Sequence, residues 1–270
     1  MTPTWRGAGP PPARPFGPGD WWRVGRRGLP VAIITFGGLA LHLALRLVER
    51  AFHGQRRPWT PHVTRVVCIA NLRLMGIPAT WEGEAAPSPA VLVANHSSWL
   101  DIFALNAGQT LVFVSKSEVA RWPAIGWLAR ATGTIFINRD RREAAAQVAM
   151  LRARLAGGER LVLFPEGTSS DGLRVLPFKP ALFAAFAGTE GLQIQPVTIR
   201  WLAPEGEDSR FYGWWGDMGF GPHLLRVLAQ GRQGRLQVIR HAPIAAAGMD
   251  RKALAAVAEA AVRAGLLSRS

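Results

Sequence analysis

The longest apolar stretch of the chain lies in its first quarter. Leu29 to Val48 is apolar apart from His42 and Arg46, and its uninterrupted part runs only from Val31 to Leu41. A transmembrane helix needs about 20 apolar residues. Arginines flank the stretch on both sides, so the positive-inside rule gives no clear orientation. The pattern favours a helix that enters one leaflet of a membrane or lies in its interface.

A second segment, His62 to Ile77, places its apolar residues on one helical face and its arginines elsewhere. We interpret residues 21–80 as a two-helix, membrane-associated anchor. One true transmembrane helix, or burial of both helices in a soluble core, are the alternatives. Residues 1–20 are rich in proline, glycine and arginine, and we expect them to form a disordered tail.

From Ala90 onward, short apolar runs alternate with helical patterns. The predicted strands are Ala90–Ala94, Thr110–Ser115, Gly133–Asn138, Arg160–Pro165, Gln193–Trp201 and Arg235–His241. The predicted helices are Trp99–Ala107, Ser117–Ala131, Arg142–Ala156, Lys179–Ala187, Gly221–Ala229 and Asp250–Leu266. This alternation predicts an α/β fold over residues 81–270, with a mostly parallel central sheet covered by helices.

Charge and cysteine content narrow the possible partners and sites. The 270 residues carry a net charge of +14, almost all of it from arginine. Such a surface favours anionic lipids, phosphorylated substrates or nucleic acid, although frequent arginine is also typical of a GC-rich genome. Cys68 is the single cysteine, which excludes an intramolecular disulfide and a cysteine-based zinc site.

The most informative polar residues follow the first predicted strand of the α/β region. His96 and Asp101 lie five positions apart, which on one regular helix would separate them by about 140°. They can meet if His96 lies in the turn after the strand and Asp101 in the first turn of the next helix. A carboxylate bonded to one imidazole nitrogen leaves the other able to take a proton from an alcohol.

No G-x-S-x-G nucleophile elbow is present in the sequence. We therefore expect His96 to act as a general base on the hydroxyl of the substrate itself, which then attacks an acyl thioester directly. The alternative for an isolated pair of this spacing is a capping histidine and a surface aspartate. The position after a buried strand favours the catalytic interpretation.

Two further groups of residues follow predicted strands. Arg139, Arg141 and Arg142 form a basic cluster suited to phosphate or carboxylate, or else a solvated helix start. Glu166 and Gly167 end a buried strand at a tight turn, where the glutamate can bind substrate hydroxyls, orient the arginines or simply face water. Lys179 brings another cation near this turn.

Four sequence blocks together resemble the glycerolipid acyltransferases typified by 1-acylglycerol-3-phosphate O-acyltransferase. They are Asn95-His96 through Asp101, Gly133 through Arg139, Phe164-Pro165-Glu166-Gly167-Thr168 and Ile194-Gln195-Pro196-Val197, in the expected order. The resemblance implies a catalytic pair of His96 and Asp101. Candidate substrate-binding residues are Asn95, Arg139, Arg142, Glu166, Gly167, Thr168 and Lys179.

The resemblance also implies an acyltransferase domain over residues 81–270, a lysolipid acceptor, and acyl carrier protein or acyl-CoA as donor. It implies no metal and no cofactor. One departure concerns the acceptor: members that use a phosphate acceptor usually have arginine after F-P-E-G-T, whereas this chain has Ser169. Lyso-ornithine lipid acyltransferases resemble this variant, so we favour lyso-ornithine lipid over 1-acyl-glycerol-3-phosphate, although one enzyme can use both.

Two other functions remain open from the sequence. One is a lipid hydrolase that uses the same pair to activate water, and the other is a non-catalytic protein that binds anionic lipid. No recognisable nucleic-acid-binding module is present, so we expect no nucleic-acid partner. The expected location is the cytoplasmic face of a bacterial inner membrane, as a monotopic or single-pass protein.

Overall fold

The computed structural model describes the whole chain except residues 1–3, 13, 123, 139–141 and 269–270. Its helices are α1 (Pro18–His53), α2 (Thr60–Met75), α3 (Leu100–Gly108), α4 (Ile125–Ala131), α5 (Ala144–Ala156), α6 (Phe220–Ala229) and α7 (Arg251–Leu267). Short 3₁₀ helices occupy Ser117–Arg121 and Pro180–Phe183. The strands are β1 (Ala79–Glu82), β2 (Ala90–Ala94), β3 (Val112–Lys116), β4 (Ile135–Ile137), β5 (Arg160–Leu163), β6 (Gln193–Leu202), β7 (Arg235–Arg240) and β8 (Ile244–Ala245).

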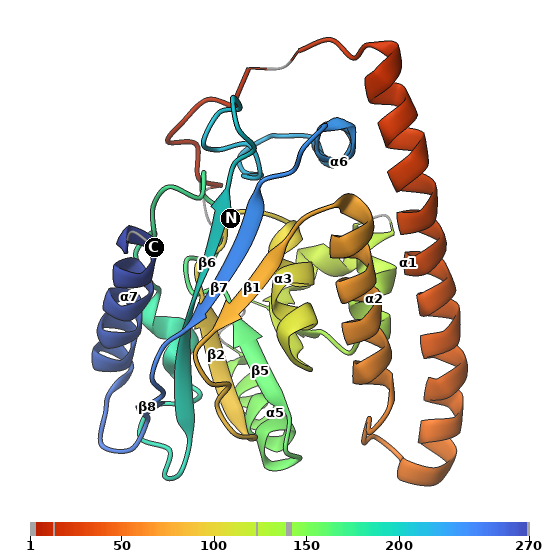
Figure 1. Ribbon diagram of the computed structural model, residues 1–270. Coiled ribbons are helices and arrows are strands. Elements are labelled where there is room, and N and C mark those ends of the chain that lie inside the picture. Colours follow the sequence, from red (N-terminus) through yellow and green to blue (C-terminus); the bar gives the residue numbers. More distant parts are fainter. Residues whose placement is uncertain (1–3, 13, 123, 139–141, 269–270) are drawn as a thin grey trace.

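The strands form one mixed sheet in the order β1-β7-β6-β2-β5-β3-β4, with β8 pairing to β6. All pairs are parallel except β6 with β7 and β6 with β8. Helices cover both faces of the sheet (Figure 1). The predicted α/β fold with a mostly parallel sheet is therefore confirmed.

The central strand β2 separates two hydrophobic cores. Because side chains alternate along a strand, Leu92 and Ala94 face a core shared with α2, α3 and α6. Val91 and Val93 face the other core, shared with α5 and α7. Every residue of β2 is buried, as expected for a parallel strand covered on both faces.

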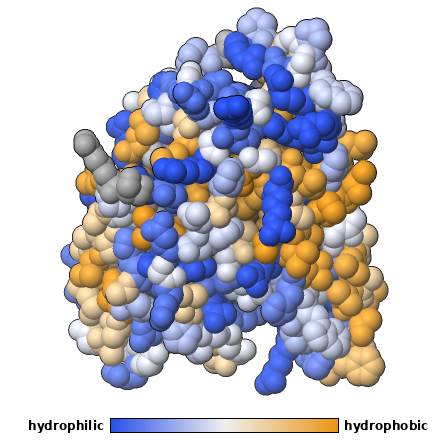
Figure 2. All heavy atoms as spheres, viewed as in Figure 1, coloured by the Kyte–Doolittle hydropathy of each residue, from blue (hydrophilic) through white to orange (hydrophobic). Residues whose placement is uncertain are grey.

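The two amino-terminal helices differ in their surroundings. Among the described helices, α1 is long and apolar enough to cross a membrane. It packs along α2 at one side of the molecule, and Figure 2 shows apolar side chains gathered on that side. In contrast, α2 buries Cys68, Leu72 and Met75 in the core of the α/β domain. The expected two-helix anchor is thus reduced to one strongly apolar helix and a partner that covers the sheet.

The predicted extent of two helices was wrong. The helix expected over Ser117–Ala131 is a 3₁₀ turn followed by α4, because Trp122, which precedes a proline, has extended backbone at ψ 134°. The helix expected over Lys179–Ala187 is only the 3₁₀ turn Pro180–Phe183. The edge strand β1 was not predicted, since four residues give little periodic signal, and it crosses the boundary drawn at residue 81.

Candidate active site

His96 and Asp101 meet where β2 leads into α3. The apolar strand ends at Ala94, the chain turns through residues 95–99, and α3 begins at Leu100. This arrangement brings Nδ1 of His96 to 2.8 Å from Oδ2 of Asp101. The predicted pairing of the two side chains, with the histidine in the turn and the aspartate in the first helical turn, is confirmed.

The Asp101 carboxylate is buried and held by donors on both oxygens. Its Oδ2 accepts hydrogen bonds from the backbone N–H groups of Ser97 at 2.8 Å and Ser98 at 2.9 Å, in addition to His96. Its Oδ1 accepts from the indole Nε1 of Trp201 at 2.7 Å. Such charge-assisted bonds compensate the desolvation of a buried carboxylate. They also leave it one orientation, which faces the imidazole.

The imidazole of His96 is fixed from a second direction by an aromatic ring. Phe164 stacks on it with 4.1 Å between ring centroids and 15° between planes. With its Nδ1–H donated to Asp101, the ring presents Nε2 as its proton acceptor. The His96 side chain is 21% exposed, whereas Asp101 is fully buried. The pair therefore has a solvent-facing base supported by a buried anion.

The turn after β5 supports the backbone of the histidine. Val93 of β2 pairs with Leu163 of β5 in parallel register, so the residues that follow the two strands lie beside each other. Glu166 accepts from the backbone N–H of His96 at 2.7 Å and from that of Leu176 at 2.9 Å. Burial raises the pKa of Glu166 to about 8, although both hydrogen bonds act in the opposite direction.

Gly167 permits a close approach inside the same turn. Its φ is +68°, and a Cβ at this position would lie 2.5 Å from Nζ of Lys179. The predicted need for glycine is confirmed, and the predicted cation lies against the turn. The neighbouring Thr168 accepts a hydrogen bond at Oγ1 from the backbone N–H of Trp5 at 3.3 Å.

Comparisons with known proteins show the family to which the chain belongs. A family model described as acyltransferase matches residues 79–200, which include the His96–Asp101 pair and the Glu166 turn. A lyso-ornithine lipid O-acyltransferase from Rhodobacter capsulatus is 54% identical over 99% of both chains. The chain belongs to this acyltransferase family. It is an enzyme of lipid biosynthesis that acylates lysolipids, as the sequence predicted.

Further relatives of this acyltransferase carry two kinds of name. A lyso-ornithine lipid O-acyltransferase from Rhizobium meliloti is 41% identical over 81% of this chain and 76% of its own length. A 1-acyl-sn-glycerol-3-phosphate acyltransferase from Neisseria gonorrhoeae is 35% identical over 53% of this chain and 56% of its own. The crystal structure of the acyltransferase PlsC from Thermotoga maritima shares the fold, with a TM-score of 0.58 and 20% identity, over 90% of this chain and 99% of that one.

The other predicted binding residues of the acyltransferase are not all brought to the pair. Both polar atoms of the buried Asn95 amide bind the backbone of Ile199, at 2.9 and 2.8 Å, so this side chain joins β2 to β6. Arg142 is exposed and lies between the edge strand β4 and α5. Two strands, β5 and β3, separate β4 from β2, the strand that leads to His96. Arg139 and Arg141 lie outside the described residues.

Sequence reasoning missed two supporting groups. Trp201 lies 100 positions after Asp101 and reaches it because β6 runs parallel beside β2. Trp214 donates its backbone N–H to the carbonyl of Ser97 at 2.7 Å, so the aromatic segment after β6 closes over the histidine turn. For Trp214, the available signal was the number of aromatic residues in the segment after β6. A packed loop or the lining of an acyl-chain tunnel explains that composition equally well.

Proposed function

We propose that this enzyme transfers a fatty acyl group from acyl carrier protein or acyl-CoA to the free hydroxyl of lyso-ornithine lipid. The observation that carries the reaction is the supported pair of His96 and Asp101. The choice of acceptor rests on similarity over almost the full chain to a relative named for lyso-ornithine lipid, and on Ser169 at the position usually occupied by arginine in phosphate-using members.

In the proposed reaction, Nε2 of His96 takes the proton of the acceptor hydroxyl as its oxygen attacks the thioester carbonyl. The buried Asp101 stabilises the imidazolium that forms. The tetrahedral intermediate then collapses, the C–S bond breaks, and His96 returns the proton to the departing thiolate. The products are the ester and the free thiol of the carrier, and no acyl-enzyme is needed.

The test is transfer from a labelled acyl donor to lyso-ornithine lipid and 1-acyl-glycerol-3-phosphate in parallel, with each carrier. We expect His96→Ala to abolish transfer while binding to lipid vesicles is kept. Release of free fatty acid without any acceptor would point to a hydrolase. Preferred use of the phosphate acceptor would contradict the proposed acceptor and leave the catalytic pair intact.

We further propose that α1 lies in one leaflet and does not cross the bilayer. Two positions along α1, one near its start and one about two-thirds of the way along it, are bound to the α/β domain. Near its start, Arg23 donates to the carbonyl of Ala229 at 2.6 Å. Further along, Nε2 of His42 lies 2.9 Å from the carbonyl oxygen of Ala131. The two contacts lie 19 residues apart along α1, which is about 28 Å and close to the thickness of the hydrocarbon core of a bilayer. A spanning α1 would therefore hold them on opposite sides of the membrane.

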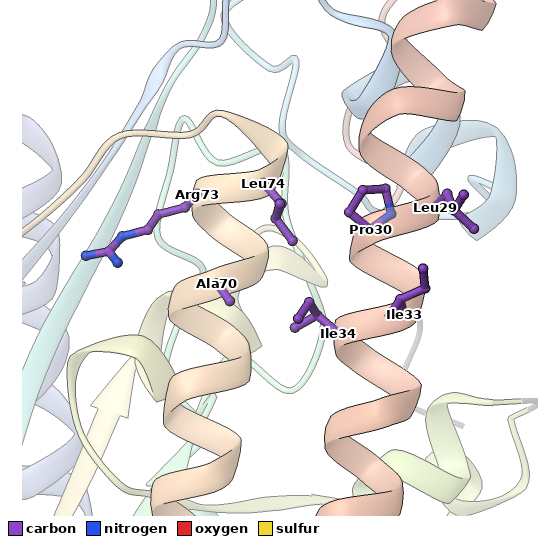
Figure 3. Close-up of a pocket in the computed structure, with 7 residues that line it drawn as sticks. All are labelled: Leu29, Pro30, Ile33, Ile34, Ala70, Arg73 and Leu74. Atoms are coloured by element: carbon purple, nitrogen blue, oxygen red, sulfur yellow. The ribbon is translucent and has the colours of Figure 1, made fainter.

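The opposite face of α1 suits the lipid. Exposed side chains on it include Leu29, Ile33, Phe36, Leu43 and Leu47. Between α1 and α2 lies an apolar hollow of about 510 Å³, into which Ile34 and Leu74 point, while Arg73 extends away (Figure 3). We propose that the enzyme lies on the cytoplasmic face of a bacterial inner membrane. The exposed apolar surface supports the membrane association, and the proposed donors, acyl carrier protein or acyl-CoA, suit that face.

Labelling of single cysteines tests this topology. In a Cys68→Ser background, Thr4→Cys and Gln55→Cys place a thiol before and after α1. We expect a membrane-impermeant maleimide to label both in inverted inner-membrane vesicles and neither in spheroplasts. Labelling of the two positions from opposite sides would establish a spanning helix.

A further inference from the structure

The loop after the Glu166 turn replaces the expected phosphate-binding arginine with a different arrangement. Ser170 donates its backbone N–H to the carbonyl of His96 at 2.9 Å, which fastens the loop to the catalytic turn. The next residue, Asp171, is buried, and its carboxylate accepts from Nε of Arg174 at 3.1 Å and from Nη2 at 3.0 Å. An arginine therefore stands near the site, although not at the position where the resemblance led us to expect one.

The guanidinium of Arg174 is held in place and still accessible. Asp171 occupies one edge of the planar group, and the ring of Trp5 covers one face at 5.4 Å. The side chain of Arg174 is nevertheless 51% exposed, compared with 1% for Asp171. Its outer edge retains donors in the fork geometry that matches a carboxylate. Pairing and stacking reduce the entropy that the side chain loses on binding.

The ring over Arg174 comes from the amino-terminal segment, which was expected to be disordered. Trp5 packs edge-on against Trp215 at 6.0 Å, and Nε1 of Trp215 donates to the carbonyl of Ala8 at 2.9 Å. Trp5 also binds Thr168 of the F-P-E-G-T turn. In Figure 1 the segment before α1 crosses the loops at the end of β6. Trp5, Ala8 and Trp215 lie outside residues 79–200, the part of the chain that matches the family model.

We propose that Arg174, held between Asp171 and Trp5, binds the carboxylate of the acceptor headgroup and selects a zwitterionic lysolipid over a phosphate lysolipid. The proposal rests on the function proposed above. Because Asp171 already balances the charge of Arg174, the pair suits a monoanionic carboxylate with an ammonium nearby. A phosphate dianion at the same place would be repelled by Asp171.

A chemical and mutational cycle tests this contact. The acceptors are lyso-ornithine lipid, its carboxylate methyl ester and 1-acyl-glycerol-3-phosphate, and the main variant is Arg174→Gln. We expect Arg174→Gln to lower kcat/KM on the free acid roughly 10- to 100-fold, through KM. For the wild-type enzyme, kcat/KM should fall by the same factor when the methyl ester replaces the free acid. For Arg174→Gln, kcat/KM should be the same on the ester as on the free acid.

Arg226→Gln is the matched control, since Arg226 also pairs with a carboxylate, Glu207, and stacks on a ring, Phe211, but is only 19% exposed. It should leave the preference between acceptors unchanged. Trp5→Ala should raise KM for lyso-ornithine lipid without changing kcat. Asp171→Asn should improve the phosphate acceptor relative to lyso-ornithine lipid.

Equal losses of Arg174→Gln on acid and ester, or no loss on the acid, would overturn the inference while leaving the proposed function in place. Absence of transfer to every lysolipid by the wild-type enzyme would instead refute the proposed function. If Arg174→Gln does not fold, the comparison of free acid with methyl ester on the wild-type enzyme tests the inference. Equal kcat/KM values would show that no cation binds the carboxylate, and would overturn it.

Discussion

The hydrogen bonds of Asp101 allow a specific prediction, because each of the four described partners of its carboxylate is a hydrogen-bond donor. Asp101→Asn replaces one oxygen with an NH₂ group. If the amide oxygen takes the place of Oδ2, it still accepts from His96, Ser97 and Ser98, but the NH₂ group then meets the indole N–H of Trp201 at 2.7 Å. The reverse orientation sets NH₂ against three donors, so we expect the first.

Removing the indole N–H of Trp201 should relieve the clash between the two donors. Asp101→Asn and Trp201→Phe should each lower the free energy of unfolding by about 1.5 to 3 kcal/mol, since each removes a hydrogen bond to a buried charge. The double variant should lose about 1 to 2 kcal/mol less free energy of unfolding than the two single losses added together. The reason is that the indole N–H that faces the new NH₂ group is gone. The phenyl ring keeps much of the packing of Trp201 on Tyr212, 5.1 Å away.

Catalysis should respond differently from stability. Without the negative charge, the imidazolium of His96 loses its support in either background. We expect Asp101→Asn to lower kcat roughly 100- to 1000-fold, or about 3 to 4 kcal/mol in activation free energy. Adding Trp201→Phe should restore stability but not kcat. Trp201→Phe alone keeps the charge and should lower kcat by less than about tenfold.

Equilibrium unfolding in detergent and kcat at saturating acceptor measure the two effects. Asp250→Asn is a suitable control: Asp250 caps α7 by accepting from Lys252 and Ala253, and asparagine caps helices about as well. Additive stability losses would show that Trp201 does not oppose the new amide. A kcat for Asp101→Asn within threefold of wild type would refute the role of the charge.

Two further predictions concern the turn after β5. Because burial raises the pKa of Glu166 from 4.5 to about 8, the folded state binds a proton more tightly there. Stability from this group is full below pH 4.5 and is lost as pH rises towards 8, by up to about 1.4 kcal/mol per pH unit. Glu166→Gln should remove this slope, and an unchanged slope in pH-dependent unfolding would disprove it. Gly167→Ala should cost about 1 to 3 kcal/mol from strain at φ +68°, plus the displacement of Lys179. Gly158→Ala, at φ +84° with open space around it, isolates the strain, and equal denaturation midpoints would exclude the Lys179 contact.

Short-range features of this enzyme were predictable from the sequence. The apolar run Ala90–Ala94 identifies a strand buried on both faces, and His96 and Asp101, the proposed catalytic pair, lie only five residues apart after it. Their meeting depends on one turn and the first residues of α3. The glycine at position 167 was predictable for the same reason, since a tight turn constrains the backbone of its own residue.

Other parts of the site depend on which strands become neighbours. Trp201 reaches Asp101, and Glu166 reaches the backbone of His96, because β6 and β5 flank β2 in parallel register. Local periodicity contains no information about that order. Composition likewise predicted disorder for the tail rich in proline and glycine, whereas Trp5 packs on residues more than 160 positions away. The sequence determined the chemistry of the base and its anion, and tertiary packing determined what holds them and what surrounds the acceptor.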